Sequence, residues 1–145
     1  MIFAMGIFYG GLAQVIAGLQ EFKKSNTFGA TAFTSYGLFW LTFVFLNVFP
    51  SFNPAWAVAV DKLSMSAYLV CWGIFTGAMF FGTLKTNRVL QFVFLSLTVL
   101  FFLLAIADFL TYAALTDLAG LVGMIAGYEG IVCGASAFYL SLIHI

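Results

Sequence analysis

The sequence predicts an all-α membrane protein, built as a bundle of transmembrane helices. Hydrophobic residues make up 64% of its 145 residues and charged residues 7%, whereas an ordinary soluble domain carries about 25% charged residues. The mean hydropathy is +1.14, and five basic residues balance five acidic ones. So few charges could not cover the surface of a soluble domain. This excludes a soluble enzyme, a nucleic-acid-binding protein and a disordered tail.

Long uncharged runs mark the helices, because a span of the bilayer needs roughly 20 mostly apolar residues. The first predicted span, 2–20, precedes Glu21. The second, 31–49, lies in the longest uncharged run, 25–60, which begins after Lys24. Spans of this number and length do not fit a secretory signal peptide followed by a soluble domain.

The third and fourth spans are separated by a short basic loop. The third, 66–84, ends before Lys85. The fourth, 89–107, begins after Arg88 and ends before Asp108.

The fifth span, 118–142, follows Asp117 and contains a charge of its own, Glu129. An ionised carboxylate inside a membrane is costly, so it marks either a functional group or a protonated structural one. The functional interpretation makes Glu129 a candidate for proton coupling or gating. The structural one makes it a hydrogen-bonded packing residue.

The basic residues predict the orientation of the chain. Lys23 and Lys24 lie in the first loop, and Lys85 and Arg88 lie in the third, so four of the five basic residues share one face. Loops rich in Lys and Arg stay in the cytoplasm. The C-terminus is therefore expected inside and residue 1 outside. An uncharged N-terminus on the outer side leads us to expect that a preceding helix is missing from this chain.

Glycines recur at the spacing that lets membrane helices approach closely. Such GxxxG pairs favour helix packing, either within one protomer or between protomers. The pairs are Gly6 with Gly10, Gly73 with Gly77, Gly123 with Gly127, and Gly130 with Gly134.

The segment 24–37 is rich in hydroxyl, amide and glycine residues although it leads into an apolar span. One interpretation is a helix that begins inside the membrane and points its N–H groups at an anion. The other is an ordinary loop whose polar side chains cap the next helix. The residues alone leave both open.

Residues for enzymatic chemistry are missing. His144 and Ser136 are eight residues apart, about 12 Å along a helix, which is too far for a nucleophile and its base. Cys71 and Cys133 form no metal-binding or redox pair and are expected to be packing residues. No nucleotide-binding motif is present. We therefore expect no enzyme, no metal and no cofactor.

Several motifs resemble the acetate uptake transporters, also called succinate–acetate permeases. The matching stretches occur in the family's order and are 4–14, 21–29, 31–37, 81–85 and 133–137. The resemblance implies a fold of six transmembrane helices, a hexameric ring and one pore in each protomer. Residues 1–145 then form a single permease domain without the family's first helix and C-terminal tail.

The resemblance also implies roles for individual residues. Tyr36 and Leu97 match the aromatic and aliphatic members of a hydrophobic pore constriction, and Ala137 matches a small pore-lining position. Other candidates for substrate-binding or pore-lining contacts are Gln14, Asn26, Thr27 and Ser35. For each of these residues, the alternative is a role in helix packing.

The expected function is transport of acetate and similar small monocarboxylates, including succinate as a candidate, across the cytoplasmic membrane. A narrow apolar pore would strip water from the anion, which favours proton-linked passage. The expected partners are the carboxylate substrate, the lipid bilayer and further copies of the chain, with no nucleic acid. The competing hypothesis is a non-transporting membrane assembly or sensor subunit. A third is that the chain is inert because its pore wall is incomplete.

Overall fold

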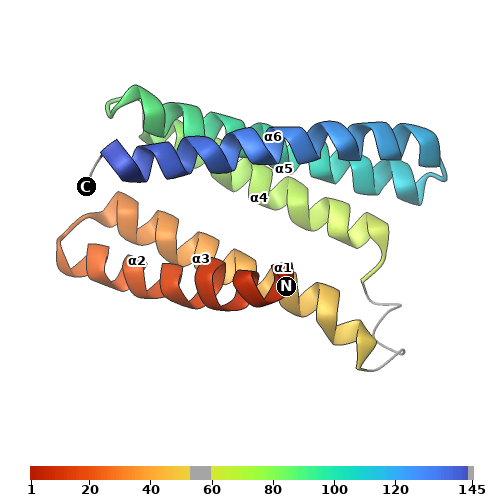
Figure 1. Cartoon of the computed structure of the whole chain (residues 1–145), viewed down its shortest axis with the longest axis horizontal. Helices are drawn as coiled ribbons and strands as arrows, with labels where there is room; N and C mark the ends of the chain where they lie inside the picture. Colours follow the sequence, from red (N-terminus) through yellow and green to blue (C-terminus); the bar gives the residue numbers. More distant parts are fainter. Residues whose placement is uncertain (53–59, 144–145) are drawn as a thin grey trace. The chain divides into compact units, whose positions relative to one another are not determined.

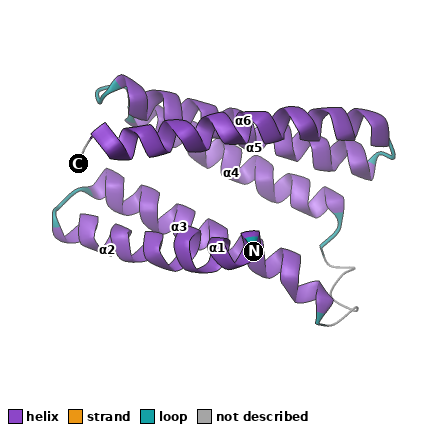
Figure 2. Ribbon diagram, in the orientation of Figure 1, coloured by secondary structure: helices purple, strands orange, loops and turns teal. Residues whose placement is uncertain are grey.

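The computed structural model describes residues 1–52 and 60–143, and these residues are helical apart from short turns (Figure 2). Five of its helical segments are long and apolar enough to cross a membrane, which confirms the predicted fold class. They are Ile2–Lys23, Thr27–Ser51, Lys62–Gly82, Arg88–Tyr112 and Thr116–Ile143. All five agree with the predicted spans to within five residues at either end.

Polar caps set where several of the helices begin. The side chains of Asn26, Asp61 and Asn87 each accept a hydrogen bond from a backbone N–H in the first turn of the following helix. Such caps satisfy N–H groups that have no partner within the helix. Two of these helices therefore begin about a turn before the predicted apolar span.

The chain forms two compact units, Met1–Val60 and Asp61–Ile145. In the first unit, α1 (Ile2–Met5), the π-helical segment η1 (Gly6–Ala13) and α2 (Gln14–Lys23) follow one another as one helical rod. This rod packs antiparallel against the helix that follows it (Figure 1). That helix is α3, Thr27–Val48, and a single 3₁₀ turn, η2, extends it over Phe49–Ser51.

Glycines allow the rod and α3 to approach closely. A Cβ atom on Gly10 would lie 2.8 Å from the ring of Trp40, and one on Gly6 would lie 3.2 Å from the same ring. A Cβ on Gly18 would lie 2.8 Å from the backbone nitrogen of Thr34. The Gly6–Gly10 pair therefore packs within the protomer, which confirms close packing for this GxxxG motif.

The second unit contains three helices: α4 (Lys62–Gly82), α5 (Arg88–Tyr112) and α6 (Thr116–Ile143). α5 packs against both of the others (Figure 1). The buried residues of α6 are Ala119, Ala126 and Cys133, which recur every seven residues. This spacing makes a narrow seam of small side chains along one face of α6, as in a coiled coil.

The other glycine pairs behave differently from one another. A Cβ on Gly73 would lie 3.1 Å from the Phe102 ring, so this glycine admits an aromatic side chain of α5. A Cβ on Gly77 or Gly130 would make an ordinary contact at 3.6 Å. Gly123 has nothing within 4 Å of its added Cβ in the described part of the chain. The same holds for Gly127 and Gly134.

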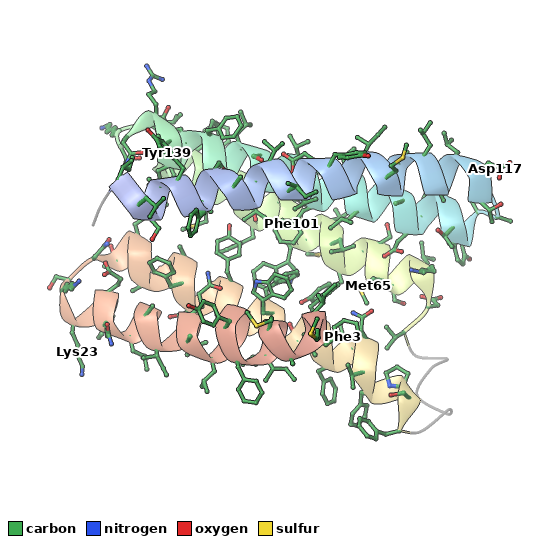
Figure 3. All side chains as sticks on the ribbon, in the orientation of Figure 1. Phe3, Lys23, Met65, Phe101, Asp117 and Tyr139 are labelled. Atoms are coloured by element: carbon green, nitrogen blue, oxygen red, sulfur yellow. The ribbon has the colours of Figure 1, made fainter. Side chains whose placement is uncertain are left out.

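An ion pair fastens one end of the second unit. Lys62 Nζ at the start of α4 lies 2.6 Å from Asp108 Oδ1 near the end of α5. The loop between α4 and α5, with Lys85, lies at the other end of these helices, as two antiparallel helices require. Asp117 and Tyr139 mark opposite ends of α6 (Figure 3). The inside and outside faces stay a prediction from the basic residues.

Candidate functional site

The turn between α2 and α3 is held by a polar network. Asn26 Oδ1 accepts a hydrogen bond from the Gly29 N–H at 3.0 Å, and Asn26 Nδ2 donates to Glu21 Oε2 at 2.5 Å. α3 then runs unbroken from Thr27 to Val48. This geometry supports the interpretation of the polar segment as a capped loop, since the helix begins at its cap. Both ends of the Asn26 amide are used within the turn.

A π-helical segment precedes the first polar candidate of the site. Gln14 is the first residue of α2, immediately after η1, and its side chain is half-buried. π-helical turns are rare and occur often at functional sites. The segment contains Gly6, Gly10 and Gly11, whose weak helical preference permits the wider turn. Sequence periodicity missed this feature, and its glycine content is the one signal that could have indicated it.

The other candidates of the first unit lie on α3. Tyr36 is buried and 7% exposed, and Ser35 beside it is half-buried. Thr27 is the first residue of the helix, and its side chain is exposed. It lies more than two helical turns from Tyr36. Ser35 and Tyr36 therefore form one local group, and Thr27 belongs with Asn26 at the end of the helix.

The second unit carries the remaining candidates. Leu97 on α5 is half-buried, and Ala137 on α6 is exposed. Ala137 lies eight residues beyond Glu129 on the same helix. Because Tyr36 belongs to one unit and Leu97 to the other, their meeting at a constriction stays a prediction.

A part-buried polar contact joins α5 to α6 beside Leu97. Ser96 Oγ donates a hydrogen bond to Glu129 Oε1 at 2.5 Å. The second carboxyl oxygen, Glu129 Oε2, is buried and has no hydrogen-bond partner among residues 1–52 and 60–143. One turn further along α6, Cys133 Sγ lies 3.9 Å from the backbone oxygen of Val93. Sequence reasoning singled out Glu129 but gave it no partner.

Outside the membrane-spanning segments, Asp61 shows the electrostatics of a helix cap. Hydrogen bonds from the Ser64 side chain and backbone N–H hold the pKa of the Asp61 carboxyl below its usual value. The Ser64 N–H lies 2.7 Å from Asp61 Oδ1. The cap is thus a carboxylate under ordinary conditions, and its negative charge suits the N-terminal end of α4.

The residues considered for enzymatic or metal chemistry form no such site in the part of the chain that the structure describes. Ser136 Oγ donates to the Cys133 backbone oxygen at 2.7 Å, as a helical serine commonly does. His144, the one histidine in the sequence, lies outside the described residues. Over the described ranges, no three His, Cys, Asp or Glu side chains gather to hold a metal ion.

Comparison with known proteins identifies relatives over almost the whole chain. The model of the GPR1/FUN34/yaaH family matches residues 1–144. The succinate-acetate/proton symporter SatP of Escherichia coli is 56% identical over 142 residues, which cover 98% of this chain and 71% of SatP. Acetate permease A of Emericella nidulans is 36% identical over 113 residues, which cover 73% of this chain and 38% of the permease.

A solved structure agrees with the arrangement of the helices. The structure of the bacterial acetate channel SatP matches with a TM-score of 0.84 and 52% sequence identity, covering 97% of this chain and 73% of the other. These relatives are named as a symporter, a permease and a channel, none of them an enzyme. The resemblance to acetate transporters expected from the motifs is confirmed: the chain belongs to the GPR1/FUN34/yaaH family.

Proposed function

We propose that this chain transports acetate and similar small monocarboxylates, with succinate as a further candidate, across the cytoplasmic membrane. The observation that supports the proposal best is the match to the acetate channel structure over 97% of the chain. That match includes most of α3 and α5, the helices that carry Tyr36 and Leu97. The symporter name of a relative that is 56% identical supports a link to protons.

The proposed pathway is narrow and mostly apolar at its constriction, to which Tyr36 and Leu97 are proposed to contribute. A carboxylate that enters such a gap loses most of its water, and this desolvation is costly for an ion. Neutral acid, or an anion accompanied by a proton, therefore crosses more easily. Gln14 and Ser35 are proposed as polar contacts beside the constriction, and Ala137 as a small pore-lining residue.

Asn26 and Thr27 are proposed to act at the entrance of the pathway. They lie in and beside the capped turn between α2 and α3 and are exposed. The exposed Thr27 hydroxyl is proposed to meet the hydrated carboxylate, and the Asn26 amide, bonded to the Gly29 N–H and to Glu21, holds the turn that positions it. The protomers are proposed to assemble as a homo-oligomer, a hexamer by resemblance to the family.

The test is uptake of radiolabelled acetate by liposomes that contain the purified full chain. We expect uptake above that of protein-free liposomes, competition by unlabelled succinate, and a change in uptake when a pH gradient is imposed. Protein-free liposomes are needed as the control because undissociated acetic acid crosses lipid unaided. Uptake equal to that of protein-free liposomes would contradict the proposal and would favour the assembly or sensor hypothesis.

A further inference from the structure

We propose that Glu129 and Ser96 form a proton-exchange site between α5 and α6, and that the proton on Glu129 fixes the position of α5 at Leu97. The proposal concerns regulation of the proposed pathway and rests on that function only in giving Leu97 a place in the constriction. The site itself is defined by contacts within the second unit.

The first step of the argument is the unequal environment of the two carboxyl oxygens. Oε1 of Glu129 accepts the hydroxyl of Ser96 at 2.5 Å, whereas Oε2 is buried with no hydrogen-bond partner in the described part of the chain. A buried ionised carboxylate needs donors on both oxygens. A proton on Oε2 removes the charge and leaves the bond from Ser96 intact. The closed contact seen here therefore suits the protonated acid.

The second step is the scarcity of charge around this carboxyl. On α5, the helix packed against α6, the charged and titratable groups all lie two or more turns from Ser96. They are Arg88, Asp108 and Tyr112. Among the described residues of α6, the only such group about one turn from Glu129 and facing α5 is the thiol of Cys133. This thiol also interacts with the Ser96 hydroxyl.

The remaining titratable groups are further away or turned outward. On α6, Tyr128 is exposed, and Asp117 and Tyr139 lie more than two turns from Glu129. On α4, which packs against the same α5, Lys62 pairs with Asp108. The others on α4 are Tyr68, which is half-buried, and Cys71, which is exposed. Within the second unit, no described cation therefore compensates an ionised Glu129, so loss of its proton leaves a buried charge.

The third step connects this charge to Leu97. When Oε2 gives its proton to water, the carboxyl O–H bond breaks and a new O–H bond forms on the water. The carboxylate that remains requires water or another hydrogen-bond donor. Oε2 is buried in the contact as it stands, so the proposed route for water is a separation of α5 and α6 at Ser96. Because Leu97 is the next residue of the same helix, its side chain moves with Ser96. Proton binding thus closes the contact, and proton release shifts the segment that carries Leu97.

The site is tested by infrared spectroscopy of the full chain in liposomes, recorded between mildly acidic and mildly alkaline pH. We expect a carboxylic-acid C=O band that titrates and that is absent from Glu129→Gln. In Ser96→Ala the band moves to higher frequency, because the hydrogen bond to Oε1 is lost. Thr98→Val is the matched control, since the Thr98 hydroxyl bonds to Phe94 O within α5. Thr98→Val should leave the Glu129 C=O band at its position in the parent chain.

The link to Leu97 is tested separately with a spin label on Leu97→Cys, in a chain that carries Cys71→Ala and Cys133→Ala. We expect the mobility of the label to change with pH, and the change to disappear when Glu129→Gln is added. Equal infrared spectra for the parent chain and Glu129→Gln would overturn the proton site. A pH response of the label that survives Glu129→Gln would overturn the link. Neither readout requires acetate flux, so failure of the proposed transport function is recognised independently.

Discussion

Two serine side chains join neighbouring helices of the second unit. Ser66 Oγ of α4 donates to the backbone oxygen of Ala105 on α5 at 2.8 Å, and Ser96 Oγ of α5 donates to Glu129 on α6. Both serines are buried. Lipid is as apolar as the side chains that face it, so helices in a membrane associate through close packing and such hydrogen bonds. Single hydroxyl groups therefore carry part of the stability of this unit.

Ser66→Ala is expected to destabilise the chain by about 0.5–1.5 kcal/mol, because it removes one interhelical hydrogen bond from a buried site. The measurement is the free energy of unfolding in mixed detergent micelles. Ser141→Ala, at an exposed position on α6, is the control and should change the free energy of unfolding little. Equal losses for the two variants would mean that the bond to Ala105 contributes nothing specific.

Leu97→Ala is expected to let larger acids pass, because it removes three carbon atoms from the proposed constriction. The ratio of lactate to acetate flux in liposomes should rise roughly tenfold, as expected when an apolar contact that excludes a larger substrate is removed. Leu95→Ala is the matched control, since Leu95 lies on the same helix and is exposed. An unchanged lactate flux in Leu97→Ala would remove Leu97 from the constriction.

At this scale, the sequence indicated which residue was unusual but not what it contacts. Glu129 could be singled out because it is a charge within an apolar span. The hydrogen-bond partner of Glu129 could not be predicted, because α5 carries several hydroxyl residues, including Ser96 and Thr98. Which of them meets the carboxyl depends on how the two helices are rotated and shifted against each other. That register follows from packing along the whole of both helices.

Among the helices, charge spacing predicted the spans and packing determined their details. The spans follow from uncharged runs because each must cross the same thickness of lipid. The helices capped by Asn26 and Asp61 begin about a turn before their predicted spans, and asparagine and aspartate are recognisable cap residues in a sequence. The π-helical segment η1 was not predicted, because the spacing of apolar residues does not distinguish it from an α-helix, and only its glycines Gly6, Gly10 and Gly11 point to it.

Gly37→Ala is expected to destabilise the first unit by about 1–3 kcal/mol, because α3 and the preceding rod touch at this point. The added Cβ would lie 2.9 Å from the backbone oxygen of Gly11 and 2.6 Å from Cγ2 of Val15. The backbone cannot yield as a flexible side chain does. The measurement is again the free energy of unfolding in micelles.

Gly77→Ala is the matched control for Gly37→Ala. Its added Cβ would lie 3.6 Å from Thr98 Cγ2, an ordinary contact, and alanine favours a helix over glycine by about 1 kcal/mol. Gly77→Ala should therefore be neutral or stabilising. If the two variants were equally stable, close approach of the helices at Gly37 would not contribute to stability.

At the scale of the whole molecule, the surface is that of a protein in lipid. Large apolar side chains such as Phe8, Phe81 and Ile131 are about two-thirds exposed. A soluble monomer rarely exposes so much apolar surface. Composition alone predicted this environment, because a chain with 7% charged residues cannot cover itself with polar groups. The pathway through the molecule could not be predicted in this way, since it depends on side chains from helices far apart in sequence.

The central proposal is that Tyr36 and Leu97 both contribute to the constriction of a pathway for small carboxylates. The most direct test introduces Tyr36→Cys and Leu97→Cys together into a chain with Cys71→Ala and Cys133→Ala. A short bifunctional methanethiosulfonate reagent, which joins two thiols through disulfide bonds, is then added to liposomes that are exchanging labelled acetate. The account predicts that acetate flux stops in the double variant, persists in each single variant, and returns on reduction of the link. Flux that continues after both cysteines have been linked to each other would contradict it.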